Sequence, residues 1–176
     1  MDPILAANRL PTLAERAIRA AIVAHCLGRT AGRRVTPRLL VNDALIRFER
    51  AVQRVAGDGV RPALLFAERD RIVRELRTFA ESRFASRLVA LHRRDVVGLR
   101  EKAHPFDAIV RGRRGGVYGL LFRRLAPGSG RLEAMRRMRA AALDYSQEPL
   151  RGVLVYDLRS GDVLSVVPRA SEYPAA

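Results

Sequence analysis

Several residue types are scarce in this sequence. It has one cysteine, Cys26, one lysine, Lys102, and no tryptophan, and aromatic residues make up 6% of its 176 residues. A single cysteine excludes an internal disulfide, a zinc site with four cysteine ligands and a cysteine-ligated iron–sulfur cluster. With so few aromatic rings, aliphatic side chains must do most of the packing in any core.

Long hydrophobic runs are also lacking. The longest apolar run, residues 20–24, is far shorter than the roughly 20 apolar residues that span a bilayer as a helix. The N-terminal residues Met1, Asp2 and Pro3 do not form the basic region followed by an apolar region that begins a secretory signal peptide. We therefore expect a cytoplasmic protein without a membrane partner.

Arginine is the residue present in excess. The chain has 33 basic and 18 acidic side chains, a formal net charge of +15, and every basic residue except Lys102 is an arginine. A GC-rich genome explains the preference for arginine over lysine, but it does not explain the surplus of bases over acids. The surplus predicts a polyanionic partner, nucleic acid first and DNA before RNA, with a membrane surface or an acidic protein as alternatives.

Apolar residues recur at helical spacing in the first half of the chain, and we expect a helical region over residues 1–85. Thr12 and Glu15 fit a capping box at a helix start, and Pro37 and Pro62 suit the first positions of two further helices. In the third helix Glu68 and Glu75 lie seven residues apart and share one face. We expect them to be solvent-exposed charges, or alternatively additional acids of a site.

After residue 86 the apolar period changes from 3.6 to 2, which is typical of strands. A helix is predicted at 131–145, between two strands, and this crossover allows the strand after it to run parallel to an earlier one. The fold class expected is α/β, with the helical region packed on a small mixed sheet over 86–168 and a loose tail over 169–176. The predicted strands are 87–92, 95–99, 106–111, 117–124, 152–158 and 163–167.

The order and spacing of these segments resemble the core of PD-(D/E)xK nucleases, above all the nuclease domains attached to bacterial recombination helicases. The segments that carry the resemblance are 87–92, which resembles the strand that enters the core, 103–110, 116–124, 131–145 and 152–157. The resemblance implies a restriction-endonuclease-like sheet in which Asp107 is the first metal ligand and 116–124 is the (D/E)xK strand. It also implies Mg²⁺ as cofactor, because carboxylates hold this ion for phosphodiester hydrolysis.

The catalytic signature is incomplete. If Arg123 stands at the lysine position, Leu121 stands at the acid position; if Arg124 does, the acid position is Phe122. Neither register supplies a carboxylate, and arginine holds its proton too firmly to act as a general base. We therefore expect a nucleic-acid-binding protein with weak or no nuclease activity, acting in a DNA-processing or defence complex.

Two alternatives remain open. The chain could be an active Mg²⁺-dependent nuclease whose second acid has moved to the following helix, with Asp107, Glu133 and Arg123 as catalytic residues and Asp107 on the metal. Otherwise Glu133 only complements the dipole of the helix first turn, and Asp107 only caps a turn after Pro105. The second alternative is a structural subunit that binds a protein.

Arginines are concentrated between residues 111 and 139, where Glu133 is the only acid. The planar guanidinium suits phosphate, so this segment predicts salt-dependent contacts with a nucleic-acid backbone. We expect the strands 106–111 and 117–124 to form a hairpin. Its tip, the end of its second strand and the helix 131–145 would then bring these side chains together. The arginines are Arg111, Arg113, Arg114, Arg123, Arg124, Arg131, Arg136, Arg137 and Arg139.

Overall fold

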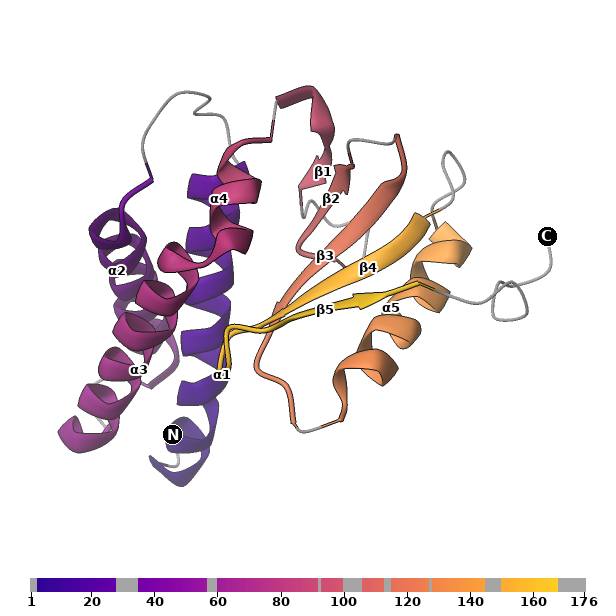
Figure 1. Cartoon of the computed structure of the whole chain (residues 1–176). Coiled ribbons are helices and arrows are strands. Elements are labelled where there is room, and N and C mark those ends of the chain that lie inside the picture. The colour runs from indigo at the N-terminus through magenta and orange to yellow at the C-terminus, as the bar shows by residue number, and fades with distance from the viewer. Residues whose placement is uncertain are drawn as a thin grey trace. The chain divides into compact units, whose positions relative to one another are not determined.

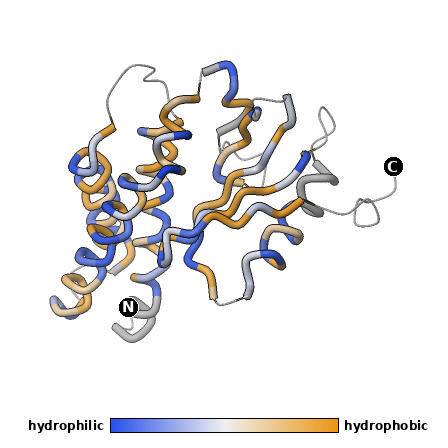
Figure 2. Tube along the Cα trace, in the orientation of Figure 1, coloured by the Kyte–Doolittle hydropathy of each residue, from blue (hydrophilic) through white to orange (hydrophobic). Residues whose placement is uncertain are grey.

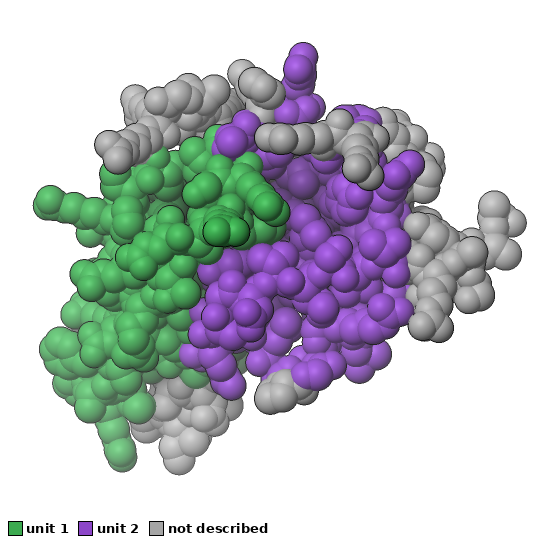
Figure 3. All heavy atoms as spheres, in the orientation of Figure 1, with its two compact units in different colours: residues 1–26, 32–89 green, residues 27–31, 90–176 purple. Residues whose placement is uncertain are grey.

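The computed structural model describes residues 3–27, 35–56, 60–91, 93–99, 106–112, 115–126, 128–144 and 150–167, without the side chains of 3–8, 56, 93, 98, 99 and 138–144. The chain forms two compact units (Figure 3): a helical unit, residues 1–26 and 32–89, and a sheet unit, residues 27–31 and 90–176. The predicted α/β class is confirmed. The predicted loose tail, 169–176, lies outside the described residues.

The helical unit consists of α1 (Pro3–Ile22), α2 (Pro37–Ala56), α3 (Pro62–Glu81) and the short α4 (Arg83–Val89) (Figure 1). A π-helical turn, Val23–Leu27, follows α1. Aliphatic side chains and two phenylalanines fill the interior, as the scarcity of aromatic residues requires. The largest fully buried side chains of this unit are Leu10, Ile18, Ile22, Leu40, Phe48, Ile72, Leu76 and Phe79.

The first helix begins earlier than predicted. It starts at Pro3 and runs through Pro11 and Thr12, so the capping box expected at Thr12 is wrong. Glu15 instead forms an ion pair of 3.7 Å with Arg19, one turn further along the helix. The predicted starts of α2 and α3 at prolines are confirmed. Proline suits the first position of a helix because its φ is helical and because the amide at that position makes no hydrogen bond within the helix.

The strand predicted at 87–92 is wrong, because residues 87–89 belong to α4 and residues 90 and 91 are a turn and irregular backbone. Ser82 ends α3 and begins α4: its Oγ donates to the Phe79 carbonyl at 2.6 Å and accepts the Ala85 amide at 3.1 Å. Ala85 and Leu88 are buried and lie three residues apart, which is helical spacing. The apolar residues of this segment fit both a helix and a strand, and the Ser82 side-chain cap favours the helix.

The sheet unit contains five strands in the order β1-β2-β3-β4-β5 and one long helix, α5 (Gly130–Asp144). Neighbouring strands are antiparallel except β3 and β4, which are parallel across the crossover through α5, as predicted. Figure 1 shows α5 running along one face of the sheet. The strands are β1 (Val96–Leu99), β2 (Ala108–Arg111), β3 (Val117–Arg123), β4 (Leu150–Asp157) and β5 (Val163–Val166).

One apolar cluster joins the sheet to α5. Leu121 of β3, Val155 of β4 and Ala134 of α5 are fully buried in it. Leu121 and Val155 are neighbours in the parallel ladder, so they lie on the same side of the sheet. Figure 2 shows the central strands as largely hydrophobic, which fits strands that are buried on both faces. This packing fixes which side chains of β3 point toward α5.

Cys26 is a partly buried thiol. Burial raises the pKa of its thiol from the ordinary value of 9.0 to about 12. The folded state therefore favours the protonated thiol. This preference contributes to the free energy of unfolding at pH values below the pKa of the thiol in the unfolded chain, and the contribution is lost as the pH rises through the pKa of the thiol in the folded chain. We expect Cys26 to react slowly with an aromatic disulfide reagent at mildly alkaline pH and at the rate of a free thiol in urea. Rapid reaction of the native protein, followed by absorbance, would contradict this burial.

Candidate functional site

The carboxyl ends of the parallel strands β3 and β4 meet at one edge of the sheet, here called the carboxyl edge. Arg123 and Asp157 are direct neighbours there in the β3–β4 ladder. Asp107 precedes β2, whose first residue pairs with Leu120, and therefore lies beside the end of β3. The carboxyl ends of strands are the common location of ligand sites in α/β sheets.

Asp107 and Arg123 form a buried ion pair at this edge. The Arg123 Nη1 lies 2.7 Å from the Asp107 Oδ2, and the two residues are 8% and 1% exposed. The same nitrogen donates to the Phe122 carbonyl at 2.8 Å. The guanidinium therefore neutralises the carboxylate inside the fold.

The backbone explains why an aspartate stands at position 107. Its amide donates to the Leu120 carbonyl at 2.9 Å, next to the first residue pair of the β2–β3 ladder. The side chain then accepts the Phe122 amide on Oδ2 at 2.8 Å. Asp107 thus extends the pairing of β2 with β3 through its side chain and satisfies a buried backbone donor.

The position of β3 that the resemblance assigns to the acid of (D/E)xK contains no acid. Side chains two residues apart in a strand lie on the same side, so Leu121 is the residue that accompanies Arg123. Leu121 is fully buried in the apolar cluster with α5. Its neighbour Phe122 packs against Tyr156, with the ring centroids 6.5 Å apart. Both residues that the sequence offers at the acid position are therefore core residues.

Glu133, the candidate for a migrated acid, forms its described ion pairs with arginines of its own helix. Its Oε1 accepts the Arg137 Nε at 2.9 Å, and its Oε2 lies 3.9 Å from Arg136. These are pairs at i, i+4 and i, i+3, which support the first turns of an exposed helix. Of the three predicted catalytic residues, the structure thus brings Asp107 and Arg123 into contact and pairs Glu133 within α5.

The residues at this edge do not fit a Mg²⁺ site. Mg²⁺ requires oxygen ligands in near-octahedral geometry, usually one or two carboxylates together with waters. Asp107 is inaccessible and its Oδ2 is occupied by the Phe122 amide and Arg123. Within the described part of the chain, no three His, Cys, Asp or Glu side chains come together in an arrangement that could hold a metal ion.

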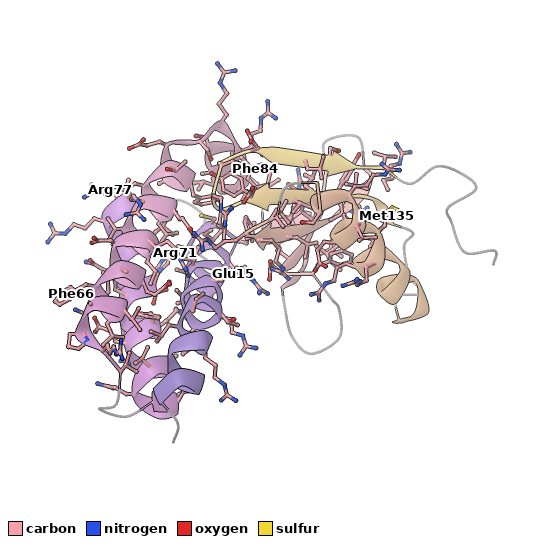
Figure 4. All side chains as sticks on the ribbon, turned by 90° about the horizontal axis from the view of Figure 1, so that it is seen from below. Glu15, Phe66, Arg71, Arg77, Phe84 and Met135 are labelled. Carbon is pink, nitrogen blue, oxygen red and sulfur yellow. The ribbon has the colours of Figure 1, made fainter. Side chains whose placement is uncertain are left out.

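Glu68 and Glu75 are not the solvent-exposed charges that we expected. Arg71, which is 6% exposed, lies between them on α3, with Nη2 2.6 Å from Glu68 and Nε 3.8 Å from Glu75. Arg71 also donates to the Pro11 carbonyl of α1 at 2.9 Å, and Figure 4 labels it on α3. The two carboxylates therefore hold a buried arginine that ties α3 to α1.

The predicted arginine field is divided between the two ends of the sheet. Arg111 lies at the hairpin tip, where it pairs with Val117, whereas Arg123 is at the far end of β3. Since a strand rises about 3.3 Å per residue, these ends are roughly 20 Å apart. The expectation that all these arginines are neighbours is wrong. Arg113, Arg114 and the side chain of Arg139 lie outside the described residues.

The carboxyl edge nevertheless has basic surroundings. Arg124 follows β3 directly, and Arg131 and Arg136 are exposed on the first turns of α5. The Leu125 amide donates to Asp157 at 3.3 Å and ties the loop before α5 to the β4–β5 turn. That turn presents Arg159, which is exposed and was not among the predicted nucleic-acid-binding residues, although it lies between the predicted strands 152–158 and 163–167. We call Arg124, Arg131, Arg136 and Arg159 the edge arginines.

Comparison of the chain with protein-family models, with curated proteins and with solved structures finds no match. Functional inference therefore depends on the carboxyl edge and on the charge of the surface. In the part of the chain that the structure describes, no helix has the length and apolar character needed to cross a membrane.

Proposed function

We propose that this chain binds nucleic acid, with DNA as the preferred partner, on a degenerate restriction-endonuclease-like sheet unit that does not hydrolyse it. The observation that carries the proposal is the buried pair of Asp107 and Arg123 at 2.7 Å. The resemblance implies a strand parallel to the (D/E)xK strand after a crossover helix, and β3, α5 and β4 have this arrangement. The topology therefore supports the nuclease-like assignment, and the ion pair argues against hydrolysis.

The loss of hydrolysis follows from the chemistry of the pair. A nuclease of this class needs a cation that is open to solvent, because the metal must polarise the phosphoryl group and activate a water. The Arg123 guanidinium instead neutralises Asp107 from inside the fold, with almost no exposed surface. It offers no open coordination position, and arginine does not accept a proton from water at physiological pH.

Binding remains possible without hydrolysis. The edge arginines surround the carboxyl edge, and a guanidinium can donate two parallel hydrogen bonds to a phosphate. Such contacts position a backbone without reading its sequence. The proposed activity is thus salt-dependent binding with weak sequence preference, which would suit a subunit that holds DNA for an enzyme.

Fluorescence anisotropy with a labelled DNA duplex tests the proposal. We expect the logarithm of the association constant to fall linearly with the logarithm of salt between about 50 and 200 mM, because each phosphate contact releases counterions. The double substitution Arg131→Gln/Arg136→Gln removes two edge arginines and should reduce the slope by about 1.8, at roughly 0.9 per contact.

The matched control is Arg94→Gln/Arg151→Gln. Both arginines are exposed and lie at the opposite end of the sheet, next to the start of β1 and at the start of β4. The control lowers the net charge equally, so an equal loss in both variants would contradict an interface at the carboxyl edge. Absence of binding by the unmodified chain at low salt would overturn the proposal and favour a protein-binding subunit.

A further inference from the structure

The acidic side chains of the helical unit are largely used in internal ion pairs. Glu49 pairs with Arg69 at 2.6 Å and Asp43 with Arg47 at 2.9 Å. Glu15, Glu68 and Glu75 have the arginine partners described above. These carboxylates neutralise the charge of the arginines that they contact. The positive charge of the other arginines of this unit is not neutralised by them.

The remaining arginines face solvent. Among the described residues of the helical unit, ten arginines are exposed and take part in no side-chain ion pair, whereas Asp70 and Glu81 are the exposed acids. Like charges on one surface repel one another, and a polyanionic partner relieves that repulsion. The ten are Arg9, Arg16, Arg38, Arg50, Arg54, Arg61, Arg74, Arg77, Arg83 and Arg87.

Four of these arginines are concentrated where α3 meets α4. Arg74 and Arg77 lie three residues apart on α3, and Arg83 and Arg87 lie four apart on α4, so each pair shares a helix face. Figure 4 labels Arg77 on α3. We call Arg74, Arg77, Arg83 and Arg87 the joint arginines.

The surroundings of the joint arginines indicate the kind of partner. Thr78 is exposed between them and can donate a hydrogen bond to phosphate, whereas the Ser86 hydroxyl donates to the Ser82 carbonyl at 3.4 Å. A helix that lies in a membrane interface also needs an exposed apolar face. From residue 74 to residue 87 the exposed side chains are polar or charged, with Glu81 the single acid, and Val89 at the end of α4 is the one exposed apolar side chain of that helix. The composition therefore favours a phosphate backbone over a lipid surface.

We infer that the joint arginines form a second nucleic-acid-binding surface, separate from the carboxyl edge of the sheet unit. The inference rests on the proposed function and extends it: the helical unit supplies its own contacts with a nucleic-acid backbone, in addition to those of the sheet unit. Sequence inspection alone overlooked this surface, since the exposed arginines of the helical unit cannot be told from the paired ones without the structure.

The test compares two variants of the full chain that each lose four arginines. The first, Arg74→Gln/Arg77→Gln/Arg83→Gln/Arg87→Gln, removes the joint arginines. The second, the control, is Arg16→Gln/Arg38→Gln/Arg50→Gln/Arg54→Gln, which removes four exposed arginines of α1 and α2 from the same unit. Circular dichroism spectra are used to check that both variants are folded. Binding to the labelled duplex is then measured as a function of salt concentration.

We expect the first variant to lose at least about tenfold in affinity at low salt and to reduce the salt slope by about 3.6, four contacts at roughly 0.9 each. The control variant should retain most of both. An equal loss in the two variants, or no loss in the first, would overturn this inference while leaving binding at the carboxyl edge intact. A wild-type chain that binds anionic phospholipid vesicles but not the duplex would overturn both proposals.

Discussion

Replacement of Arg123 by alanine is expected to lower the free energy of unfolding by about 3–5 kcal/mol, the usual cost of leaving one partner of a buried ion pair alone. Asp107 would remain at 1% exposure without this guanidinium, while its Oδ2 still accepts the Phe122 amide. Urea denaturation followed by far-ultraviolet circular dichroism measures the change as a shift of the unfolding midpoint.

Two further variants isolate the ion pair. The double substitution Asp107→Asn/Arg123→Met removes both charges, and we expect it to recover much of the loss, because a neutral pair of similar shape avoids the unpaired charge. Arg94→Ala, which removes an exposed arginine next to the start of β1, should change stability by less than about 0.5 kcal/mol. A loss below about 1 kcal/mol for Arg123→Ala would show that the pair is solvated and that Asp107 is accessible to other partners.

Leu121→Glu, which would add the acid that the proposed nuclease resemblance lacks, should destabilise the fold by about 4 kcal/mol or more, because it removes a buried leucine and places a carboxylate in an apolar cluster. Leu121 is fully buried among Val155, Ala134 and their neighbours. Leu121 is therefore part of the core packing, and we expect that this single substitution does not create a metal site. The measurement is again the free energy of unfolding in urea.

Leu121→Met is the matched control, since it conserves volume and polarity and should cost less than about 1.5 kcal/mol. The account would be contradicted if Leu121→Glu were as stable as Leu121→Met and gained stability on addition of Mg²⁺. That combination would mean that position 121 faces an open site that accepts an ion beside Asp107.

The regular parts of the sheet unit could be predicted because local pattern and tertiary packing agree there. The hairpin of β2 and β3, the crossover α5 and the parallel β4 follow from alternating apolar residues, turn glycines and one helical stretch. The segment 87–92 could not be assigned, because its apolar residues fit both periods. The deciding contact is the Ser82 cap, which depends on a residue outside the segment.

The site was harder to predict because its contacts are not local. Asp107 and Arg123 are 16 residues apart in sequence, and the sequence alone left a metal ligand and a turn cap as equal alternatives for Asp107. The burial of Glu68 and Glu75 had a local signal that was overlooked. Arg71 is three residues after one and four before the other, which is the spacing of helical ion pairs.

The separation of the arginines into two groups follows from strand length. Arginines close in sequence on either side of β3 lie at opposite ends of a seven-residue strand, so sequence proximity was a poor guide to a shared surface. On the helical unit, helix spacing places Arg74 with Arg77 on one face of α3 and Arg83 with Arg87 on one face of α4.

Incubation of a labelled duplex with the purified chain and Mn²⁺ at low salt tests the central claim most directly, with the products separated on a denaturing gel. The account predicts that the duplex is bound, as anisotropy of the same sample reports, and remains full length. Metal-dependent fragments that disappear in Asp107→Ala would contradict it, because they would require Asp107 to hold a metal ion instead of Arg123.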